Sequence, residues 1–198
     1  MPTTFGILLF DDVEELDFAG PWEVFAMAAR GREEDVRVVS VAERAEPVRA
    51  AHGLRVIPDC DFASAPPLDV LLVPGGQGTR REVDNPVLLD WIRKNAARCQ
   101  WVTSVCTGSL LLCASEVAKG KRITTHWAFV ANLRERGEAT VLEGVRYVRD
   151  GNLVTSAGVS AGIDMSLWVV GQLYGPDYAR KVQHFMEYDP APPYTAEV

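Results

Sequence analysis

The chain has 198 residues, of which 47% are hydrophobic, so we expect one sizeable core and a single domain spanning 1–198. The formal net charge is −7 at pH 7 and no run of Lys or Arg stands out, which argues against a nucleic-acid partner and favours a small ligand. Because no apolar stretch has the roughly 20 residues that cross a bilayer, and no signal peptide opens the chain, we expect a cytoplasmic protein with no membrane partner.

Apolar strands alternate with amphipathic helices along the first half of the chain. Strands are expected over 5–10, 36–41, 69–73 and from 101 to Cys106, with a small strand pair within 42–65. Gly20-Pro21 predicts a helix that ends near residue 30, since a proline is tolerated at the first helical position. A second helix is expected from about 86 to 98, with Asn85 as its cap.

The second half continues this alternation. A short strand is predicted over 122–125, followed by a helix over 128–136 that Gly137 ends, and strands over 145–149 and 153–156 flank an Asp150-Gly151-Asn152 hairpin connection. Two helices, about 161–174 and 177–188, close the domain, and the proline-rich tail from about 190 is expected to be extended. Such alternation implies an α/β fold with a mostly parallel sheet, where ligands collect outside the carboxyl ends of the strands.

Cys106 stands where an apolar strand turns into a helix through Thr107 and Gly108. The alternative is a small buried hydrophobe, the usual fate of a cysteine. The strand–Cys–helix turn, however, is the arrangement by which α/β enzymes expose a nucleophile. A helix N-terminus also favours the thiolate. We therefore predict a nucleophilic thiol at Cys106 and structural roles for the other three cysteines, with no disulfides and no metal site.

Asp17 and the Gly75-Gly76 pair follow two other predicted strands. Asp17 is either a cap for the helix near Gly20 or a carboxyl group in the same crevice as Cys106. Shielding by neighbouring apolar residues would favour its neutral form, which suits a proton donor. Gly75-Gly76 is either a tight turn or a pair of amides that join the Thr107 amide to bind developing negative charge.

His126 is the candidate base of a Cys–His pair, because it follows the short strand after the Cys106 helix. Its alternative is a packed and hydrogen-bonded histidine beside Trp127. We interpret Gly158–Gly162 as a pocket wall, and Asp164 as a group that caps or pairs near a helix N-terminus.

Six segments together resemble the ThiJ/PfpI superfamily, which is similar to class I glutamine amidotransferases, and within it the isonitrile hydratases. The resemblance extends from about residue 5 to 194, and the matching segments are 16–21, 73–76, 103–109, 120–127, 148–153 and 161–164. It implies a flavodoxin-like three-layer sandwich, a homodimer and no cofactor. It also implies a hydro-lyase that converts an isonitrile into an N-substituted formamide, with Asp17, Cys106 and Thr107 as the catalytic positions.

The chemistry expected from this resemblance is attack by Cys106 on the isonitrile carbon to give a thioimidate. Asp17 would protonate that carbon or orient water, and Thr107 and Gly76 would hold the polar atoms. In the pattern of the superfamily's proteases, a histidine directly follows the cysteine. Thr107 stands at that position here, which argues against peptidase chemistry. Two alternatives stay open, namely a ligand-sensing or chaperone-like binding module and a glyoxalase-type hydratase of 2-oxoaldehydes.

Overall fold

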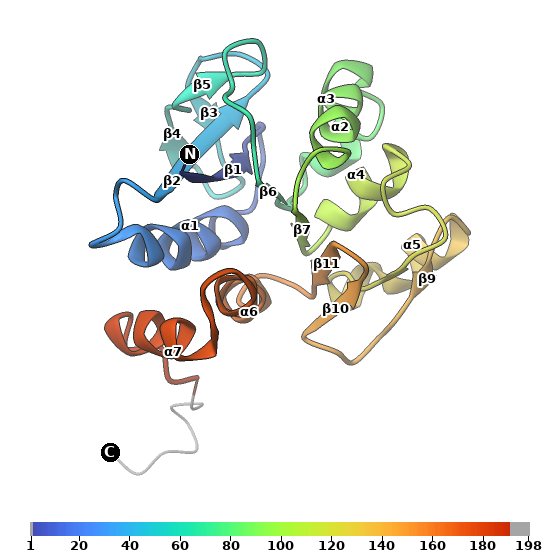
Figure 1. The fold of residues 1–198 in the computed structure, drawn as a ribbon. Helices are drawn as coiled ribbons and strands as arrows, with labels where there is room; N and C mark the ends of the chain where they lie inside the picture. The colour runs from blue at the N-terminus through green and yellow to red at the C-terminus, as the bar shows by residue number, and fades with distance from the viewer. Residues whose placement is uncertain (1, 191–198) are drawn as a thin grey trace.

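The computed structural model describes residues 2–190, in which a twisted central sheet separates two layers of helices (Figure 1). The sheet has seven strands in the order β10-β11-β7-β6-β1-β2-β5, all parallel to their neighbours except β10. The strands are β1 (Thr3–Leu8), β2 (Val36–Ala42), β5 (Cys60–Asp61), β6 (Val70–Val73), β7 (Trp101–Val105), β10 (Tyr147–Asp150) and β11 (Leu153–Ser156).

Two short strand pairs lie outside the main sheet. They are β3 (Val48–Arg49) with β4 (Arg55–Val56), and β8 (Arg122–Ile123) with β9 (Thr140–Val141). The helices are α1 (Glu15–Ala29), α2 (Thr79–Glu82), α3 (Pro86–Ala96), α4 (Gly108–Ala114), the 3₁₀ helix η1 (Trp127–Phe129), α5 (Val130–Glu135), α6 (Ala161–Tyr174) and α7 (Pro176–Phe185).

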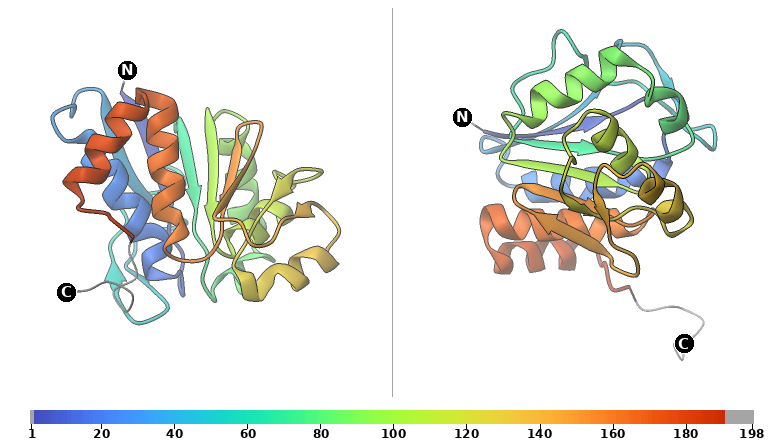
Figure 2. Two further views of the ribbon diagram at one scale, coloured as in Figure 1. Left: turned by 90° about the horizontal axis from the view of Figure 1, so that it is seen from below. Right: turned by 90° about the vertical axis from the view of Figure 1, so that its right-hand side faces the viewer.

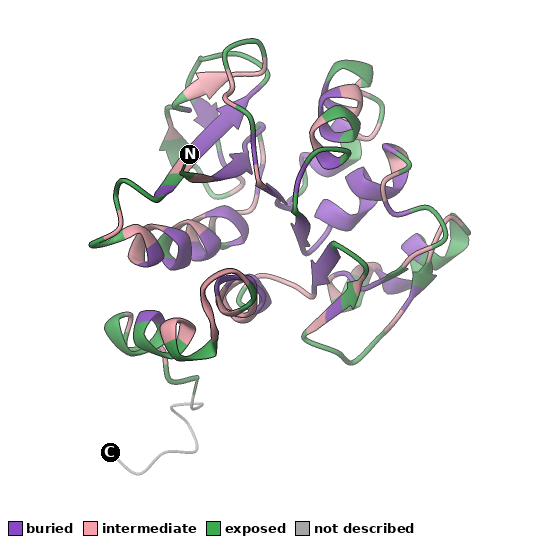
Figure 3. Cartoon of the chain, viewed as in Figure 1, coloured by how far each residue is buried: buried purple, intermediate pink, exposed green. Residues whose placement is uncertain are grey.

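Helices α1, α6 and α7 pack together on one side of the sheet, and α2 to α5 lie on the other (Figure 2). The central strands are therefore buried on both faces, which explains their continuous apolar sequences. Every residue of β6 and β7 is buried (Figure 3). Among residues 2–190, none of the helices combines the length and the apolar character that spanning a membrane requires.

The predicted α/β architecture and most elements are confirmed. Helix α6 has the predicted bounds, and the Asn85 side chain caps α3 by accepting hydrogen bonds from the Val87 and Leu88 amides at 3.1 and 3.3 Å. The hairpin between β10 and β11 is tighter than predicted, because Asp150 pairs with Leu153. No sequence pattern indicated α2 or β9, which are very short. Residues 191–198 of the predicted tail lie outside the described residues.

The prediction that the first helix begins at Gly20-Pro21 is wrong, because α1 begins at Glu15 and contains Pro21. The segment before α1 is bound to the turn after β6, through a bridge between Val13 and Gly76 and a 3.0 Å hydrogen bond from the Glu14 amide to the Gly75 carbonyl. Pro21 leaves the Asp17 carbonyl without its usual helical donor. Asp17 thus belongs to the first turn of α1, and its expected role as a cap for a helix starting near Gly20 is also wrong.

The structure leaves no room for a side chain at Gly108, where α4 begins. A Cβ atom there would lie 2.1 Å from the Val73 carbonyl oxygen. Gly108→Ala should therefore lower the free energy of unfolding by about 1–3 kcal/mol, as overpacking does. Gly171→Ala is the control, since its Cβ would meet no atom closer than 3.5 Å. Urea unfolding that finds both variants equally stable would contradict this account.

Candidate active site

The carboxyl ends of three adjacent strands, β7, β6 and β1, meet at the candidate site. Cys106 and Thr107 follow β7, Gly75 and Gly76 follow β6, and Asp17 lies on the helix that follows β1. The structure therefore brings together all five of these predicted residues. Their meeting point is the place where open α/β sheets bind ligands.

Cys106 occupies a strained turn between β7 and α4. Its φ is +55°, in the left-handed region that non-glycine residues rarely adopt. Hydrogen bonds hold this conformation, since the Cys106 amide donates to the Ala157 carbonyl at 3.0 Å and its carbonyl accepts from the Thr125 hydroxyl at 2.9 Å. The strand–cysteine–helix elbow predicted from the sequence is thus confirmed.

The surroundings of the Cys106 thiol favour a different charge state from the predicted thiolate. The side chain is only 8% exposed, and burial, followed by the nearby Asp17 charge, raises the thiol pKa to about 12. The amides of Thr107 and Val159 approach the sulfur and lower the pKa, but burial outweighs them. The helix that Cys106 precedes has only seven residues. The resting group is therefore a neutral thiol rather than the predicted thiolate.

Asp17 is fully buried beside this thiol. Its Oδ2 accepts a hydrogen bond from the Gly75 amide at 2.9 Å, whereas Oδ1 has no hydrogen-bond partner among the described residues. Burial raises the pKa of Asp17 to about 7, the Glu14 charge adds to this, and the Gly75 amide, the Val159 amide and the Cys106 thiol oppose it. A carboxyl group with this pKa exchanges a proton readily near neutral pH.

The Gly75-Gly76 turn binds Asp17 and Thr107. The Gly75 amide donates to Asp17, and the Gly76 amide donates to the Thr107 hydroxyl at 3.1 Å. A Cβ at Gly75 would lie 2.6 Å from the Thr107 nitrogen, and Gly76 has a φ of +119°. Both positions therefore require glycine. Their expected role in binding negative charge stays a prediction, since both amides already have acceptors.

Three residues that the sequence analysis did not single out also contribute to the site: Val159, Glu14 and Arg80. Val159 belongs to the predicted pocket wall and has a φ of +49°, unusual for a β-branched residue, which aims its amide at Cys106 and Asp17. Arg80 lies in α2 and donates to the Thr107 hydroxyl at 3.2 Å. No motif marks Arg80, because it is one of two consecutive arginines after a glycine-rich turn.

A cavity of about 240 Å³ lies beside Cys106. Its lining residues are Glu14, Gly76, Gln77, Arg80, Cys106, Thr107, His126, Ala128, Phe129 and Val159. Asp17 is fully buried and is not among these lining residues. A small molecule in the cavity therefore contacts Cys106, and the Asp17 carboxyl group adjoins the same thiol.

His126 lines this cavity but already has a structural contact. Its Nδ1 accepts a hydrogen bond from the Ala128 amide at 3.2 Å and thereby caps η1. No hydrogen bond joins His126 to Cys106 among residues 2–190. The Cys–His pair therefore stays a prediction, and the packed, hydrogen-bonded alternative describes the contacts that are present.

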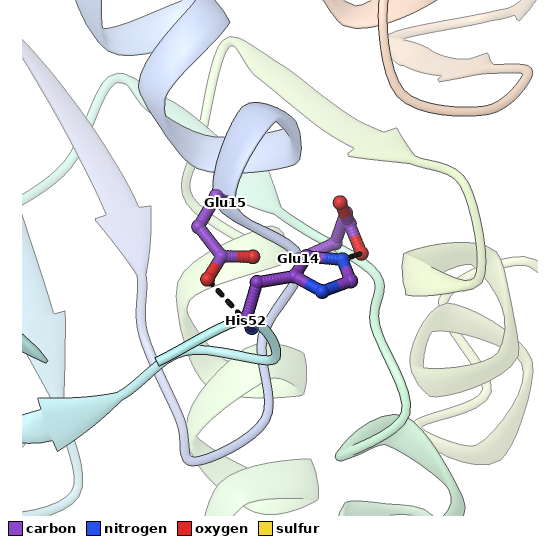
Figure 4. A group of neighbouring side chains, drawn as sticks. All are labelled: Glu14, Glu15 and His52. Carbon is purple, nitrogen blue, oxygen red and sulfur yellow. Dashed lines mark hydrogen bonds and ion pairs between the residues drawn. The ribbon is translucent and has the colours of Figure 1, made fainter. Parts of the chain in front are cut away.

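Glu14, Glu15 and His52 form a cluster at the edge of the site (Figure 4). The His52 Nε2 lies 3.5 Å from the Glu14 carboxylate, and the His52 amide donates to Glu15 at 2.7 Å. Within the described chain these three side chains offer ligand atoms that lie within 4.8 Å of one another. We interpret the cluster as a tether that holds the turn around His52 against the start of α1 and places Glu14 at the cavity.

Comparisons with known proteins find relatives of this chain in both sequence and structure. A model of the DJ-1/PfpI family matches residues 5–172. Isonitrile hydratase of Pseudomonas putida is 44% identical over 194 residues, covering 98% of this chain and 82% of that protein. The HTH-type transcriptional regulator GbdR of Pseudomonas aeruginosa is 27% identical, covering 95% of this chain and 51% of the regulator. A crystal structure of a ThiJ/PfpI family protein from Pseudomonas syringae has a TM-score of 0.88 at 33% identity, covering 100% of this chain and 80% of that one.

The burial of Asp17 should make the free energy of unfolding depend on pH. Its pKa rises from 3.8 to about 7 on folding, so the folded protein holds this proton more tightly than the unfolded chain does. Stability from this group is fully present below pH 3.8 and is lost as the pH rises to about 7. Since one pKa unit corresponds to ~1.4 kcal/mol, the loss amounts to a few kcal/mol. Asp17→Asn should abolish this loss.

The measurement is the free energy of unfolding of the wild type and Asp17→Asn between pH 4 and pH 8, with Asp35→Asn, an exposed position, as the control. The difference between Asp17→Asn and the wild type should grow in favour of the variant as the pH rises. Parallel pH profiles would show that Asp17 has an ordinary pKa.

Proposed function

From the premise that the chain belongs to the DJ-1/PfpI family, we propose that it hydrates an isonitrile to an N-substituted formamide. The 44% identity to an isonitrile hydratase, spread over nearly the whole chain, supports a hydratase-like enzyme. The observation that carries the specific proposal is the pairing of a neutral Cys106 thiol with a buried carboxyl group of pKa about 7. These two groups together offer a nucleophile and a reversible proton carrier.

The terminal carbon of an isonitrile suits this pair, because it carries a lone pair and is also electrophilic. In the first step the neutral form of Asp17 protonates that carbon while the Cys106 sulfur bonds to it, and the thiol proton passes to the Asp17 carboxylate. One S–H bond breaks, and one C–H and one C–S bond form. The product is a thioimidate, R–N=CH–S–Cys, and Asp17 is again protonated.

Water completes the reaction. Its oxygen bonds to the thioimidate carbon, one of its protons leaves through Asp17, and the nitrogen gains a proton. The tetrahedral intermediate R–NH–CH(OH)–S–Cys then loses its C–S bond, which releases the formamide and restores the thiol. A high thiol pKa does not obstruct this route, because the proton leaves the sulfur only as the C–S bond forms.

Thr107 acts in this proposal through two separate atoms. Its amide reaches the Cys106 sulfur, and its hydroxyl accepts hydrogen bonds from Gly76, Thr79 and Arg80. The first contact positions the nucleophile, and the second keeps the glycine turn against α4. The homodimer and a reaction without a cofactor remain predictions from the family resemblance, and the cytoplasmic location remains a prediction from the sequence.

The test is the turnover of cyclohexyl isocyanide, with the formamide quantified directly. Wild type should produce formamide, and Cys106→Ala should abolish turnover because no other group in the cavity supplies a sulfur. Asp17→Asn should lower kcat by about 10²–10⁴-fold, the usual value of general acid–base catalysis. Cys60→Ala, a half-buried thiol in β5, is the control and should retain activity.

The same proteins should be assayed with methylglyoxal, because conversion of this 2-oxoaldehyde distinguishes a glyoxalase-type hydratase from an isonitrile hydratase. Formamide production by Cys106→Ala at the wild-type rate would disprove the thioimidate route. A wild type that converts methylglyoxal but no isonitrile would replace the proposed substrate, and a wild type inert toward both would favour the ligand-sensing alternative.

A further inference from the structure

Arg80 lines the cavity beside Cys106, and hydrogen bonds fix one end of its guanidinium group. Its Nη1 donates to the Gly76 carbonyl at 2.8 Å and to the hydroxyls of Thr79 and Thr107 at 3.1 and 3.2 Å. The guanidinium carbon also lies 4.7 Å from the centre of the Phe129 ring, within the range of a cation–π contact. Because the group is already held in place, a ligand that binds it loses little side-chain entropy in doing so.

The opposite edge of this guanidinium has no partner in the described part of the chain. Within residues 2–190, no group accepts a hydrogen bond from Arg80 Nε or Nη2, and no carboxylate forms an ion pair with Arg80. The next residue, Arg81, differs, since it pairs with both Asp12 and Glu82. The Nε–Nη2 edge is one of the forks by which arginine binds a carboxylate with two parallel hydrogen bonds.

Arg80 and Cys106 line the same space of about 240 Å³, so one small ligand can contact both side chains. Two acidic groups near the cavity would repel an anion bound in it. Glu14 also lines the cavity, but its carboxylate lies 3.5 Å from His52 Nε2. Asp17 is not among the lining residues, and its pKa of about 7 leaves it partly protonated at neutral pH. Among the lining residues, Arg80 is the permanently charged cation.

We propose that Arg80 is a specificity-determining residue that binds a carboxylate on the substituent of the substrate while the reacting carbon meets Cys106. The substrate class is then an isonitrile with a carboxylate a few bonds from its nitrogen. The identity of the reacting group rests on the proposed function, whereas the preference for a carboxylate rests on Arg80 alone.

The first test is independent of hydration. Iodoacetate and iodoacetamide both alkylate a thiol with loss of iodide, and they differ only by a carboxylate in place of an amide. We would measure both rates at Cys106, identified by peptide mass spectrometry, and take their ratio, which cancels any change in the thiol itself. Arg80→Gln should lower the iodoacetate-to-iodoacetamide ratio about tenfold, because it removes a charged hydrogen-bond donor.

Two further variants sharpen this test. Arg80→Lys keeps the charge but loses the planar fork, so its ratio should lie between those of the wild type and Arg80→Gln. Arg93→Gln, which removes an exposed arginine paired with Asp90 on α3, should leave the ratio unchanged. An unchanged ratio in Arg80→Gln would overturn the proposal.

The second test compares isocyanoacetate with its neutral methyl ester as substrates. Wild type should have the higher kcat/KM for the carboxylate, and Arg80→Gln should reverse this preference mainly through KM. If wild type hydrates no isonitrile while its alkylation ratio still depends on Arg80, the proposed reaction fails and the carboxylate subsite stands. If wild type hydrates both isonitriles with the same kcat/KM, the subsite fails and the reaction stands.

Discussion

The carboxyl group of Asp17 has no access to solvent. Its Oδ2 accepts a hydrogen bond from the Gly75 amide, and within residues 2–190 its Oδ1 has no hydrogen-bond partner. This burial is the constraint on which the site depends. It raises the pKa of the carboxyl group to about 7, and the charged form in turn contributes to the raised pKa of the Cys106 thiol. The two groups therefore resist ionising together, and one proton is easily passed between them.

The fold supplies this burial by joining three strand ends. The segment before α1 is bound to the turn after β6 by the bridge between Val13 and Gly76, and that turn contacts the start of α4 through Thr107. Val159 completes the enclosure from the segment before α6, with its amide near both Asp17 and Cys106. A low-pKa thiolate is thus not required, because the carboxyl group can take the thiol proton during attack.

The sequence predicted the elements and the central residues because their signals are local. Buried parallel strands have continuous apolar sequences, and the elbow at Cys106 follows directly from a strand, Thr107 and a glycine. The start of α1 was predicted wrongly because Pro21 is tolerated inside a helix whose first turn is fixed by the distant Gly75. The charge state of the thiol, and the parts taken by Arg80 and Val159, depend on burial and on contacts between remote segments, which no local pattern reveals.

The most direct measurement is the titration of the Asp17 carboxyl group itself. Carbon NMR of protein labelled at the aspartate carboxyl carbons, with Asp17→Asn to identify the signal, would follow its protonation in the intact enzyme. This account predicts a midpoint near 7. A midpoint near the ordinary value of 3.8 would show that Asp17 is ionised at neutral pH and would contradict its role as the proton carrier for Cys106.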